Sequence, residues 1–491
     1  MPGSQSIPPV YRAGNTAPPE DAGSFVTNEQ RGAEPLSSAS TPATRPAPSD
    51  PRIARRARWA SLVGTSLESY DFYLFAYFSA FFAWPLFFSG LGDVGEDIAA
   101  LLTIGVAFVI RPVGAIIFGH VGDRLGRRTT LIVTITMMGI ATGLIGVLPT
   151  YDQVGWLAAV LLVVLRLVQG ISLGGEWGGA ILIATEHESR AKRAFAAAIP
   201  QLGSPIGSIL SAVAFIWLTL SLSAGEISEW AWRIPFLTAI PLLAVSLYLR
   251  LAVTETPVFE NVKQTQRRPR VPIAALLRSQ PLAVIVAVGV ALLGIGSYSL
   301  MNTYTLNYGE AVLGFDFSQI LIATTIGGML QLITIPLFGA WATRIGSGLV
   351  IAIGALGTLL VAFPLYYFLQ FADFGVLVAM MVIGGILPTM SWAALGGIFT
   401  ELFDERYRYS ALSFAYALSA AAAGFVPGLT AILGQETDNA WWHPGIVLAA
   451  MALITLVTSL IAIRMRVDND EDPGVPLAGA PLAGAAAASR G

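Results

Sequence analysis

The chain contains about twelve long apolar segments, separated from one another by short polar turns or loops. A membrane-spanning helix takes roughly 20 apolar residues, because each residue adds about 1.5 Å and the hydrocarbon core is about 30 Å thick. The segments that reach this length lie near residues 59–88, 98–119, 129–149, 155–184, 194–223, 232–253, 281–309, 317–342, 347–370, 374–400, 408–434 and 444–465. Only helices and closed barrels satisfy their backbone in lipid, and these runs lack the alternation of barrel strands. We therefore predict an all-α integral membrane protein with twelve transmembrane helices.

Charged residues are scarce and unevenly placed, which predicts the orientation. They make up 12% of the chain, whereas soluble proteins carry roughly 25%. Lys and Arg gather in alternate loops, such as those at residues 124–128, 190–193 and 250–278. Because cytoplasmic loops of membrane proteins are rich in Lys and Arg, both termini are expected in the cytoplasm of a multi-pass protein of the cell (plasma or inner) membrane.

The longest hydrophilic break inside the apolar region, residues 254–280, divides the spans into two sets of six. We interpret it as a cytoplasmic central loop between an N-terminal six-helix bundle (55–253) and a C-terminal one (281–466). Residues 1–54 and 467–491 are rich in Pro, Ala, Gly and polar residues, and are predicted to be disordered cytoplasmic tails.

A basic hairpin between the second and third spans reads Gly119-His-Val-Gly-Asp-Arg-Leu-Gly-Arg-Arg128. A weaker copy, Gly339-Ala-Trp-Ala-Thr-Arg-Ile-Gly-Ser-Gly348, follows about 220 residues later in an equivalent setting. A motif that recurs half a chain apart indicates two homologous halves, which is typical of secondary transporters. The two bundles are therefore expected to be pseudo-symmetric.

The charged side chains to weigh inside the predicted spans are Glu68, Asp71, Arg111, Arg166 and Glu176. Each charge costs roughly 2.5–3.5 kcal/mol at a helix centre, so these residues must pair or line a wet cavity. Glu68 and Asp71 are three residues apart and share a helix face. Counting about 1.5 Å per residue places Arg111 at a similar depth, which permits a cluster with these two carboxylates.

These charges suit a transporter that couples an anion to protons. The proton needs a carboxylate whose pKa burial raises and a nearby Arg lowers, and Arg holds a carboxylate substrate through two parallel hydrogen bonds. Asp71 or Glu68 is the candidate proton carrier, with a fixed ion pair between helices as the alternative. Arg166 is a candidate contact for a substrate carboxylate, and Glu176 is expected to be structural. The candidate cavity residues are Tyr70, Gln169, Tyr298, Asn302, Gln331 and Trp392.

Several motifs together resemble the metabolite:proton symporter family of the major facilitator superfamily, which includes α-ketoglutarate, citrate, shikimate and proline/betaine transporters. They are the 119–128 hairpin, Gly64-Thr-Ser-Leu-Glu68-Ser-Tyr70-Asp71-Phe72, Arg111-Pro112-Val-Gly114, Arg166-Leu-Val-Gln169-Gly170, Gly174-Gly-Glu176-Trp177-Gly-Gly179, Trp232-Arg-Ile-Pro235-Phe236 and Glu255-Thr-Pro257. The resemblance covers about residues 55–465 and implies the major facilitator fold. The family usually has Trp where this chain has Ser69.

The resemblance also implies a role for the hairpin. Its motif residues are Gly119, Asp123, Arg124, Gly126, Arg127 and Arg128. In the family this segment acts as a conformational latch near the cytoplasm, whereas charges that merely set the topology are the alternative.

The predicted function is import of a small organic acid or zwitterion by proton symport through alternating access. A proton-antiport exporter of the same fold is the alternative, and a transporter-like sensor is less favoured. The expected partners are a small carboxylate or zwitterion, protons and the lipid bilayer, and no nucleic acid is expected. The protein is predicted to be a monomer without a cofactor. The chain has no Cys, no phosphate-binding Gly-x-x-x-x-Gly-Lys sequence and no His spacing that suits a metal, so neither an enzyme nor a metal site is expected.

Overall fold

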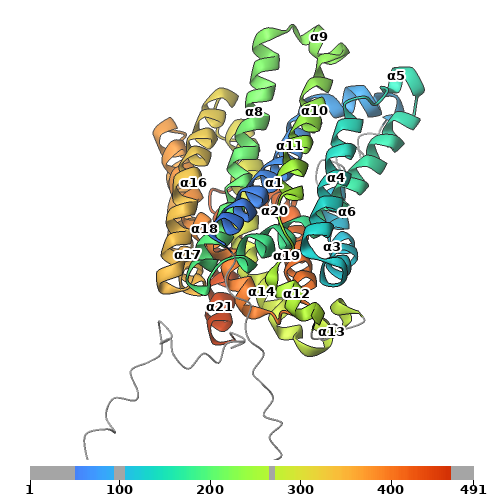
Figure 1. Ribbon diagram of the computed structural model, residues 1–491. Coiled ribbons are helices and arrows are strands. Elements are labelled where there is room, and N and C mark those ends of the chain that lie inside the picture. Colours follow the sequence, from blue (N-terminus) through green and yellow to red (C-terminus); the bar gives the residue numbers. More distant parts are fainter. Residues whose placement is uncertain (1–49, 93–104, 265–270, 466–491) are drawn as a thin grey trace, which may run out of the picture. The chain divides into compact units, whose positions relative to one another are not determined.

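The computed structural model describes residues 50–92, 105–264 and 271–465 (Figure 1). Most of the two predicted tails and the start of the second predicted span lie outside the described residues. Within the described ranges every regular element is a helix. Eleven helices are long and apolar enough to cross a membrane, or up to twelve if one bent pair forms a single span. The prediction of an all-α membrane protein is confirmed.

The chain runs through two sets of helices. The first half comprises α1 (Pro51–Phe78), η1 (Ser79–Phe88), η2 (Ser89–Leu91), α3 (Val106–Leu125), α4 (Arg127–Ile145), α5 (Tyr151–Val154), α6 (Leu157–Glu186), η3 (Arg190–Lys192), α7 (Arg193–Gln201), α8 (Gly203–Ser221), α9 (Ala224–Glu229), η4 (Ala231–Arg233), α10 (Ile234–Leu237) and α11 (Ala239–Leu251). After α12 (Pro257–Gln264) and α13 (Pro272–Ser279), the second half comprises α14 (Pro281–Ser299), η5 (Leu300–Tyr304), α15 (Thr305–Ala311), α16 (Phe317–Ile345), α17 (Ser347–Leu369), α18 (Phe374–Leu402), α19 (Arg408–Gly424), α20 (Val426–Glu436) and α21 (His443–Arg464).

The first helix begins earlier than the sequence predicted. The Asp50 side chain accepts a hydrogen bond from the backbone N of Arg52 (2.8 Å), and Pro51 occupies the first helical position. Proline suits that position because its missing N–H would have no intrahelical partner there. Four residues that were assigned to the disordered tail, 51–54, are therefore helical.

Several spans are interrupted, and the interruptions shape the interior. The segment η1 is a π-helix that contains Pro85, and η5 is a shorter π-helix that continues α14. The α7–α8 span breaks at Leu202, and the α19–α20 span breaks at Phe425, just before Pro427. Such breaks follow from proline and from local π geometry, and they turn side chains out of the regular helical register.

The two halves contact each other through a few helices. In the first half, α3 and α4 pack on α6 and α1 packs on α8; in the second, α16 and α17 pack on α18 and α17 packs on α21. Between the halves, α19 packs against α3 and α6, while α7 packs against α16 and α18. The site therefore lies among helices from both halves.

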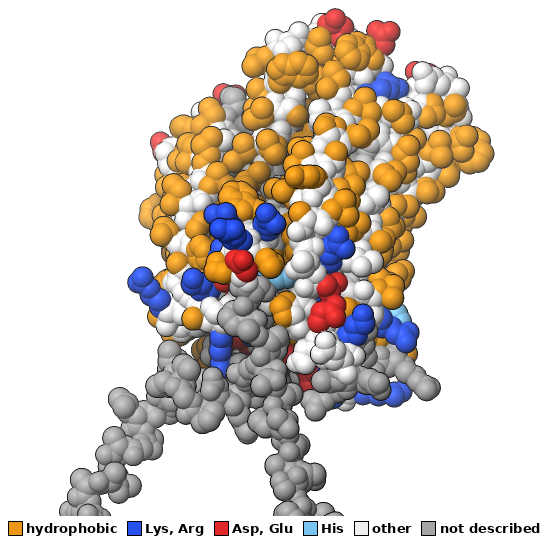
Figure 2. Space-filling view, in the orientation of Figure 1, with side chains coloured by type: hydrophobic (Ala, Val, Ile, Leu, Met, Phe, Trp, Pro, Cys, Tyr) orange, Lys and Arg blue, Asp and Glu red, His pale blue; other side chains and the backbone are white. Residues whose placement is uncertain are grey.

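The surface suits a bilayer. Large apolar side chains such as Ile285, Leu360 and Trp217 are more than half exposed. Figure 2 shows hydrophobic side chains over most of the visible face, with Lys and Arg gathered in its lower part. We call this end, where α12 and α13 lie in Figure 1, the hairpin side, because the 119–128 hairpin lies between α3 and α4 at the same end.

Candidate substrate cavity

A central cavity lies between the two halves and encloses about 970 Å³ of space free of protein atoms, part of it open to solvent. The first half lines it with Thr65, Glu68, Ser69, Phe72, Tyr73, Phe108, Arg111, Trp177 and Ser204. The second half contributes Gly294, Ile295, Ser297, Tyr298, Ser299, Met301, Asn302, Gln331, Gly384, Gly385, Pro388, Thr389, Trp392 and Tyr416. Both halves therefore contribute polar and aromatic side chains to one central cavity.

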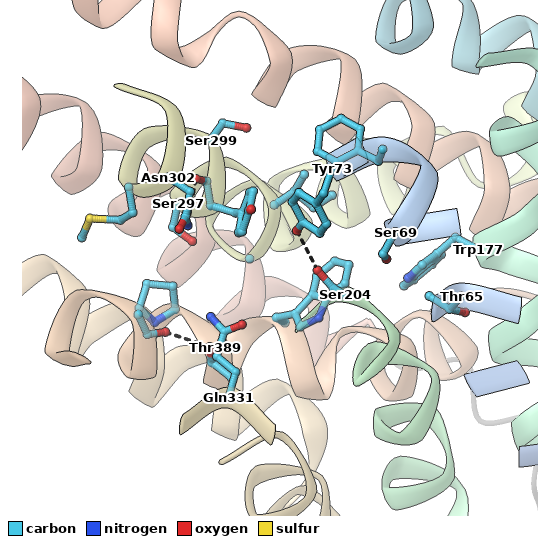
Figure 3. Close-up of a pocket in the computed structure, with 18 of the residues that line it drawn as sticks. Thr65, Ser69, Tyr73, Trp177, Ser204, Ser297, Ser299, Asn302, Gln331 and Thr389 are labelled. Atoms are coloured by element: carbon cyan, nitrogen blue, oxygen red, sulfur yellow. Dashed lines mark hydrogen bonds between the residues drawn. The ribbon is translucent and has the colours of Figure 1, made fainter. Parts of the chain in front are cut away.

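Aromatic rings and hydroxyl groups form much of its wall (Figure 3). The Tyr73 hydroxyl shares a hydrogen bond with Ser204 Oγ (3.0 Å), and its ring lies 5.2 Å from that of Tyr298. The Trp177 indole stacks on the Tyr416 ring, with centroids 4.2 Å apart and planes within 6°. These contacts fix the positions of aromatic rings on facing helices.

Glu68 and Arg111 are the two charged side chains that line this cavity within the part of the chain that the structure describes. Both are almost fully buried, at 6% and 5% exposure. Glu68 Oε2 and Arg111 Nε make no hydrogen bond with any described residue. The Arg111 guanidinium lies over the Phe108 ring, 4.7 Å from its centroid. The cavity wall thus carries one carboxyl group and one guanidinium that can still form hydrogen bonds.

Asp71 belongs to a separate network behind the cavity wall. Its Oδ1 accepts hydrogen bonds from Thr142 Oγ1 (2.5 Å) and Gln169 Nε2 (2.6 Å). Its Oδ2 lies 4.0 Å from Arg166 Nη1, which also donates to Gln169 Oε1 (2.9 Å). The Arg166 guanidinium covers the Phe75 ring at 3.7 Å. The anticipated cluster of Asp71 with Arg111 is therefore replaced by a pair with Arg166, and Arg166 does not line the cavity.

Four of the six predicted cavity residues, Tyr298, Asn302, Gln331 and Trp392, line the cavity. The other two predictions, Tyr70 and Gln169, need correction. Tyr70 points away from the cavity, because its hydroxyl donates to the Pro235 carbonyl oxygen (2.8 Å) and lies 2.7 Å from Thr238 Oγ1. Gln169 is fully buried in the Asp71 network.

Glu176 forms a buried ion pair with Arg250. The other oxygen of Glu176 accepts a hydrogen bond from Thr134 Oγ1 (2.9 Å), and Arg250 Nη1 donates to the Leu131 carbonyl oxygen (2.7 Å). The pair joins α4, α6 and α11. From the sequence, Arg250 was placed in the basic stretch 250–278. In the structure it lies in the last turn of α11 with 3% of its surface exposed.

The hairpin joins the two halves through Asp123. Its carboxylate accepts the backbone N–H groups of Tyr409 (3.1 Å) and Ser410 (2.9 Å), in the first turn of α19. The N-terminus of a helix favours a negative charge, because its first N–H groups have no intrahelical partner. Gly119 lies against the Ser410 backbone, where a Cβ would press on it. Asp123 therefore ties the end of α3 to the start of α19, and we call this contact the latch.

The remaining hairpin residues hold Asp123 in place. Arg127 Nη1 lies 3.6 Å from Asp123 Oδ1, and its Nε lies 3.5 Å from Glu186 Oε2. Glu255 accepts the backbone N–H groups of Arg127 and Arg128. Between the two helices Gly126 adopts φ +119°, a conformation that side chains with a Cβ rarely take.

Other hairpin residues and neighbours have smaller roles. Arg128 Nη2 donates to the Leu251 carbonyl oxygen (2.9 Å), whereas Arg124 is exposed and lies 3.3 Å from His120 Nε2. Burial raises the pKa of Glu255 above its ordinary value, although three backbone N–H groups oppose that shift.

The sequence did not single out several residues that the structure brings to the site. Gln201 receives the Trp177 Nε1 hydrogen bond (2.9 Å) and donates its own to the Trp392 carbonyl oxygen (2.9 Å), which connects α6, α7 and α18. Thr142 completes the Asp71 network. The signal for Gln201 was available, because it is a polar residue inside an apolar span.

A cavity between two halves, with charges buried inside the spans, is typical of secondary transporters. The model of the Major Facilitator Superfamily matches residues 72–322 and 286–489, and the chain belongs to this superfamily. The predicted fold class and family are thereby confirmed.

Curated relatives are transporters rather than enzymes. The chain is 34% identical to the inner membrane metabolite transport protein YhjE of Escherichia coli K12, over 83% of this chain and 93% of the relative. It is 34% identical to the shikimate transporter of the same organism, over 83% and 94%. It is 29% identical to the E. coli proline/betaine transporter, over 83% of each chain.

Solved structures show the same fold. The structure of the proton:xylose symporter XylE bound to 6-bromo-6-deoxy-D-glucose superposes with a TM-score of 0.69 at 17% identity. The alignment covers 84% of this chain and 96% of XylE. The protein is thus a multi-pass membrane transporter of the major facilitator fold.

Proposed function

We propose that this transporter imports a small organic acid or zwitterion together with protons. The observation that carries the proposal is that one carboxyl group, of Glu68, and one guanidinium, of Arg111, lie on the wall of the central cavity. The printed names of relatives support the substrate class, since shikimate is an organic acid and proline and betaine are zwitterions. We further propose that the hairpin side faces the cytoplasm, because Lys and Arg gather there.

Arg111 is the proposed contact for the substrate carboxylate. A guanidinium binds a carboxylate through two parallel N–H···O bonds, and in a buried site these bonds are stronger than in water. The guanidinium is fixed over Phe108, so little side-chain entropy is lost when a substrate binds. Arg166 is not available for this role, because Asp71 and Gln169 occupy it behind the wall.

Glu68 is the proposed proton carrier. Asp71 is stabilised as a carboxylate by two hydrogen bonds and by Arg166, whereas Glu68 Oε2 has no hydrogen-bond donor among the described residues. A buried carboxyl group without donors favours its neutral form, and the approach of a cation reverses that preference. Substrate that engages Arg111 leaves Glu68 without part of its counter-charge, so substrate and proton favour each other's binding.

Alternating access would follow from the latch. In this structure α19 contacts α3 and α6 on the hairpin side, so access from that side requires separation of Asp123 from the first turn of α19. We propose that the protein does this as a monomer in the lipid bilayer, with the proton as the coupling ion and no cofactor.

Proteoliposomes with an imposed pH gradient test the proposal. A panel that includes shikimate, proline and glycine betaine first identifies a substrate. Acid outside should then raise the rate and extent of its uptake. Glu68→Gln should abolish accumulation but keep exchange of labelled for unlabelled substrate, because exchange needs no net proton movement. Asp71→Asn is the parallel variant. If acidification, Glu68→Gln and Asp71→Asn all leave uptake unchanged, proton coupling is refuted.

A further inference from the structure

Arg250 occupies an unusual place for a charged residue at the end of a transmembrane helix. It lies in the last turn of α11 with 3% of its surface exposed. Its Nη2 pairs with Glu176, its Nη1 binds the Leu131 carbonyl oxygen, and its Nε has no hydrogen-bond partner among the described residues. The guanidinium is thus held through its two terminal nitrogens, by Leu131 of α4 and Glu176 of α6.

The guanidinium also lies directly against α1. A Cβ at Gly64 would overlap it, so only glycine leaves room for Arg250 at this point. Glu68 follows Gly64 by four residues, which places it on the same face of α1 about 6 Å further along. Arg250 therefore lies within about one helical turn of a second carboxylate, besides the one it already pairs with.

Glu68 is surrounded by charge from four helices. The charged groups that act on it are Asp71 on its own helix, Arg111 on α3, Glu176 on α6 and Arg250 on α11. Tyr416 of α19 also faces this group. Arg111 lines the cavity, so Arg250 is the remaining cation for which Glu68 and Glu176 compete.

The second half covers this cluster through Tyr409. Its hydroxyl donates to the Gly175 carbonyl oxygen (2.7 Å), and its backbone N–H binds Asp123 of the latch. Release of the latch would withdraw Tyr409 and admit water to the Glu176–Arg250 pair. Beside the pair, a small void is lined by Ser61, Arg128, Arg250 and four apolar residues.

On the basis of the proposed function, we infer that Arg250 is a movable counter-charge that exchanges between Glu176 and Glu68. While the hairpin side is closed, Arg250 stays with Glu176 and Glu68 keeps its proton. When α19 withdraws, Arg250 turns to Glu68, and the carboxyl group gives its proton to water on the hairpin side. Arg250 is a positioning residue, since it acts on the proton carrier and does not contact the substrate.

Labelling with dicyclohexylcarbodiimide tests this exchange without any substrate, because the reagent modifies buried carboxyl groups in their protonated form. Purified full-length protein is labelled across a pH series, and mass spectrometry measures modification at Glu68. Arg250→Gln should shift the midpoint to higher pH by about one unit or more, because a nearby cation has been lost. Glu176→Gln should shift it to lower pH, because Arg250 is released to Glu68.

Matched variants separate this role from a structural one. Gly64→Ala displaces the guanidinium without changing any charge and should shift the midpoint upward, whereas Gly328→Ala, where a Cβ meets nothing within 4 Å, should not. A fixed pair also gives shifts of opposite sign, because Glu176 and Arg250 each act on Glu68 directly. The double variant Arg250→Gln/Glu176→Gln separates the two cases: exchange predicts that Glu176→Gln lowers the midpoint more when Arg250 is present, whereas a fixed pair predicts additive shifts. Additive shifts or unchanged midpoints would overturn the exchange. Uptake that ignores external pH in the wild type would instead overturn the proposed function.

Discussion

The latch between Asp123 and α19 makes a prediction whose size follows from the structure. The carboxylate accepts two backbone N–H groups of α19 and is 2% exposed. Asp123→Asn keeps the size of the side chain, but its amide NH₂ cannot accept the second hydrogen bond. A hydrogen bond to a charged group contributes about 1.5–3 kcal/mol. Since 1.4 kcal/mol corresponds to a factor of ten, the open population of the hairpin side should rise roughly 10- to 150-fold.

Cysteine accessibility measures that population cleanly, because the chain has no native Cys. Ser413 is fully buried in α19 and lies against Gly178 of α6, so Ser413→Cys reports separation of the halves. Its rate of reaction with a maleimide should rise in the Asp123→Asn background by the factor given above. While the equilibrium between closed and open states is fast compared with labelling, the rate follows the open population.

The matched control is Asp373→Asn. Asp373 also caps a helix, since it accepts the backbone N–H of Val376 (3.0 Å), but it lies outside the contacts between the halves. It should leave the Ser413→Cys labelling rate unchanged. An equal rate in wild type and Asp123→Asn would refute the reasoning, because it would mean that the latch contributes no free energy to closure.

Three further predictions concern stability in detergent. Arg166→Gln leaves Asp71 as a buried charge without its cation and should lower the free energy of unfolding by about 3–5 kcal/mol. The double variant Asp71→Asn/Arg166→Gln should recover much of this loss. Thermal unfolding of the wild type and the two variants decides this. Tyr304→Phe removes the hydroxyl 2.5 Å from His443 Nε2 and should cost about 1–3 kcal/mol, seen as a lower melting temperature unless a water replaces the donor. Because the folded-state pKa of Glu255 is raised, the folded state binds more protons than the unfolded state between the two pKa values. Stability should therefore fall as pH rises through this window, and Glu255→Gln should flatten the pH dependence of melting.

The sequence predicted what depends on local pattern. Span length, the basic hairpin and its weaker copy were visible because apolar runs and charge clusters are properties of neighbouring residues. The close approach of α6 to its neighbours was likewise implied by its glycines: Gly174 lies on the backbone of α3 and Gly178 on that of α19. The breaks at Leu202 and in η5 were not predicted, because a span with a π-helical turn has the same hydropathy as a regular one.

The pairing between charges could not be predicted, because the depth of a residue along a helix does not say which neighbouring helix its side chain faces. Arg111 and Asp71 were placed at compatible depths, yet Arg111 faces the cavity and Asp71 faces α6. Arg250 was misassigned for a related reason. A basic residue in the last turn of a span fits a cytoplasmic loop equally well, and only the glycine at position 64 opposite it and the acid at position 176 reveal that it is buried.

Three carboxylates lie deep among the described helices of the first half, and each has different surroundings. Asp71 is matched by Arg166, and Glu176 is matched by Arg250, whereas Glu68 faces the cavity with hydrogen-bonding capacity left. The described cavity residues of the second half are uncharged, and that half provides the α19 N-terminus to which the latch binds. In the proposed mechanism, proton chemistry and conformational closure meet where Tyr409 lies between the latch and the Glu176–Arg250 pair. A transporter that works in this way would open toward the hairpin side only by exposing the groups that control its proton.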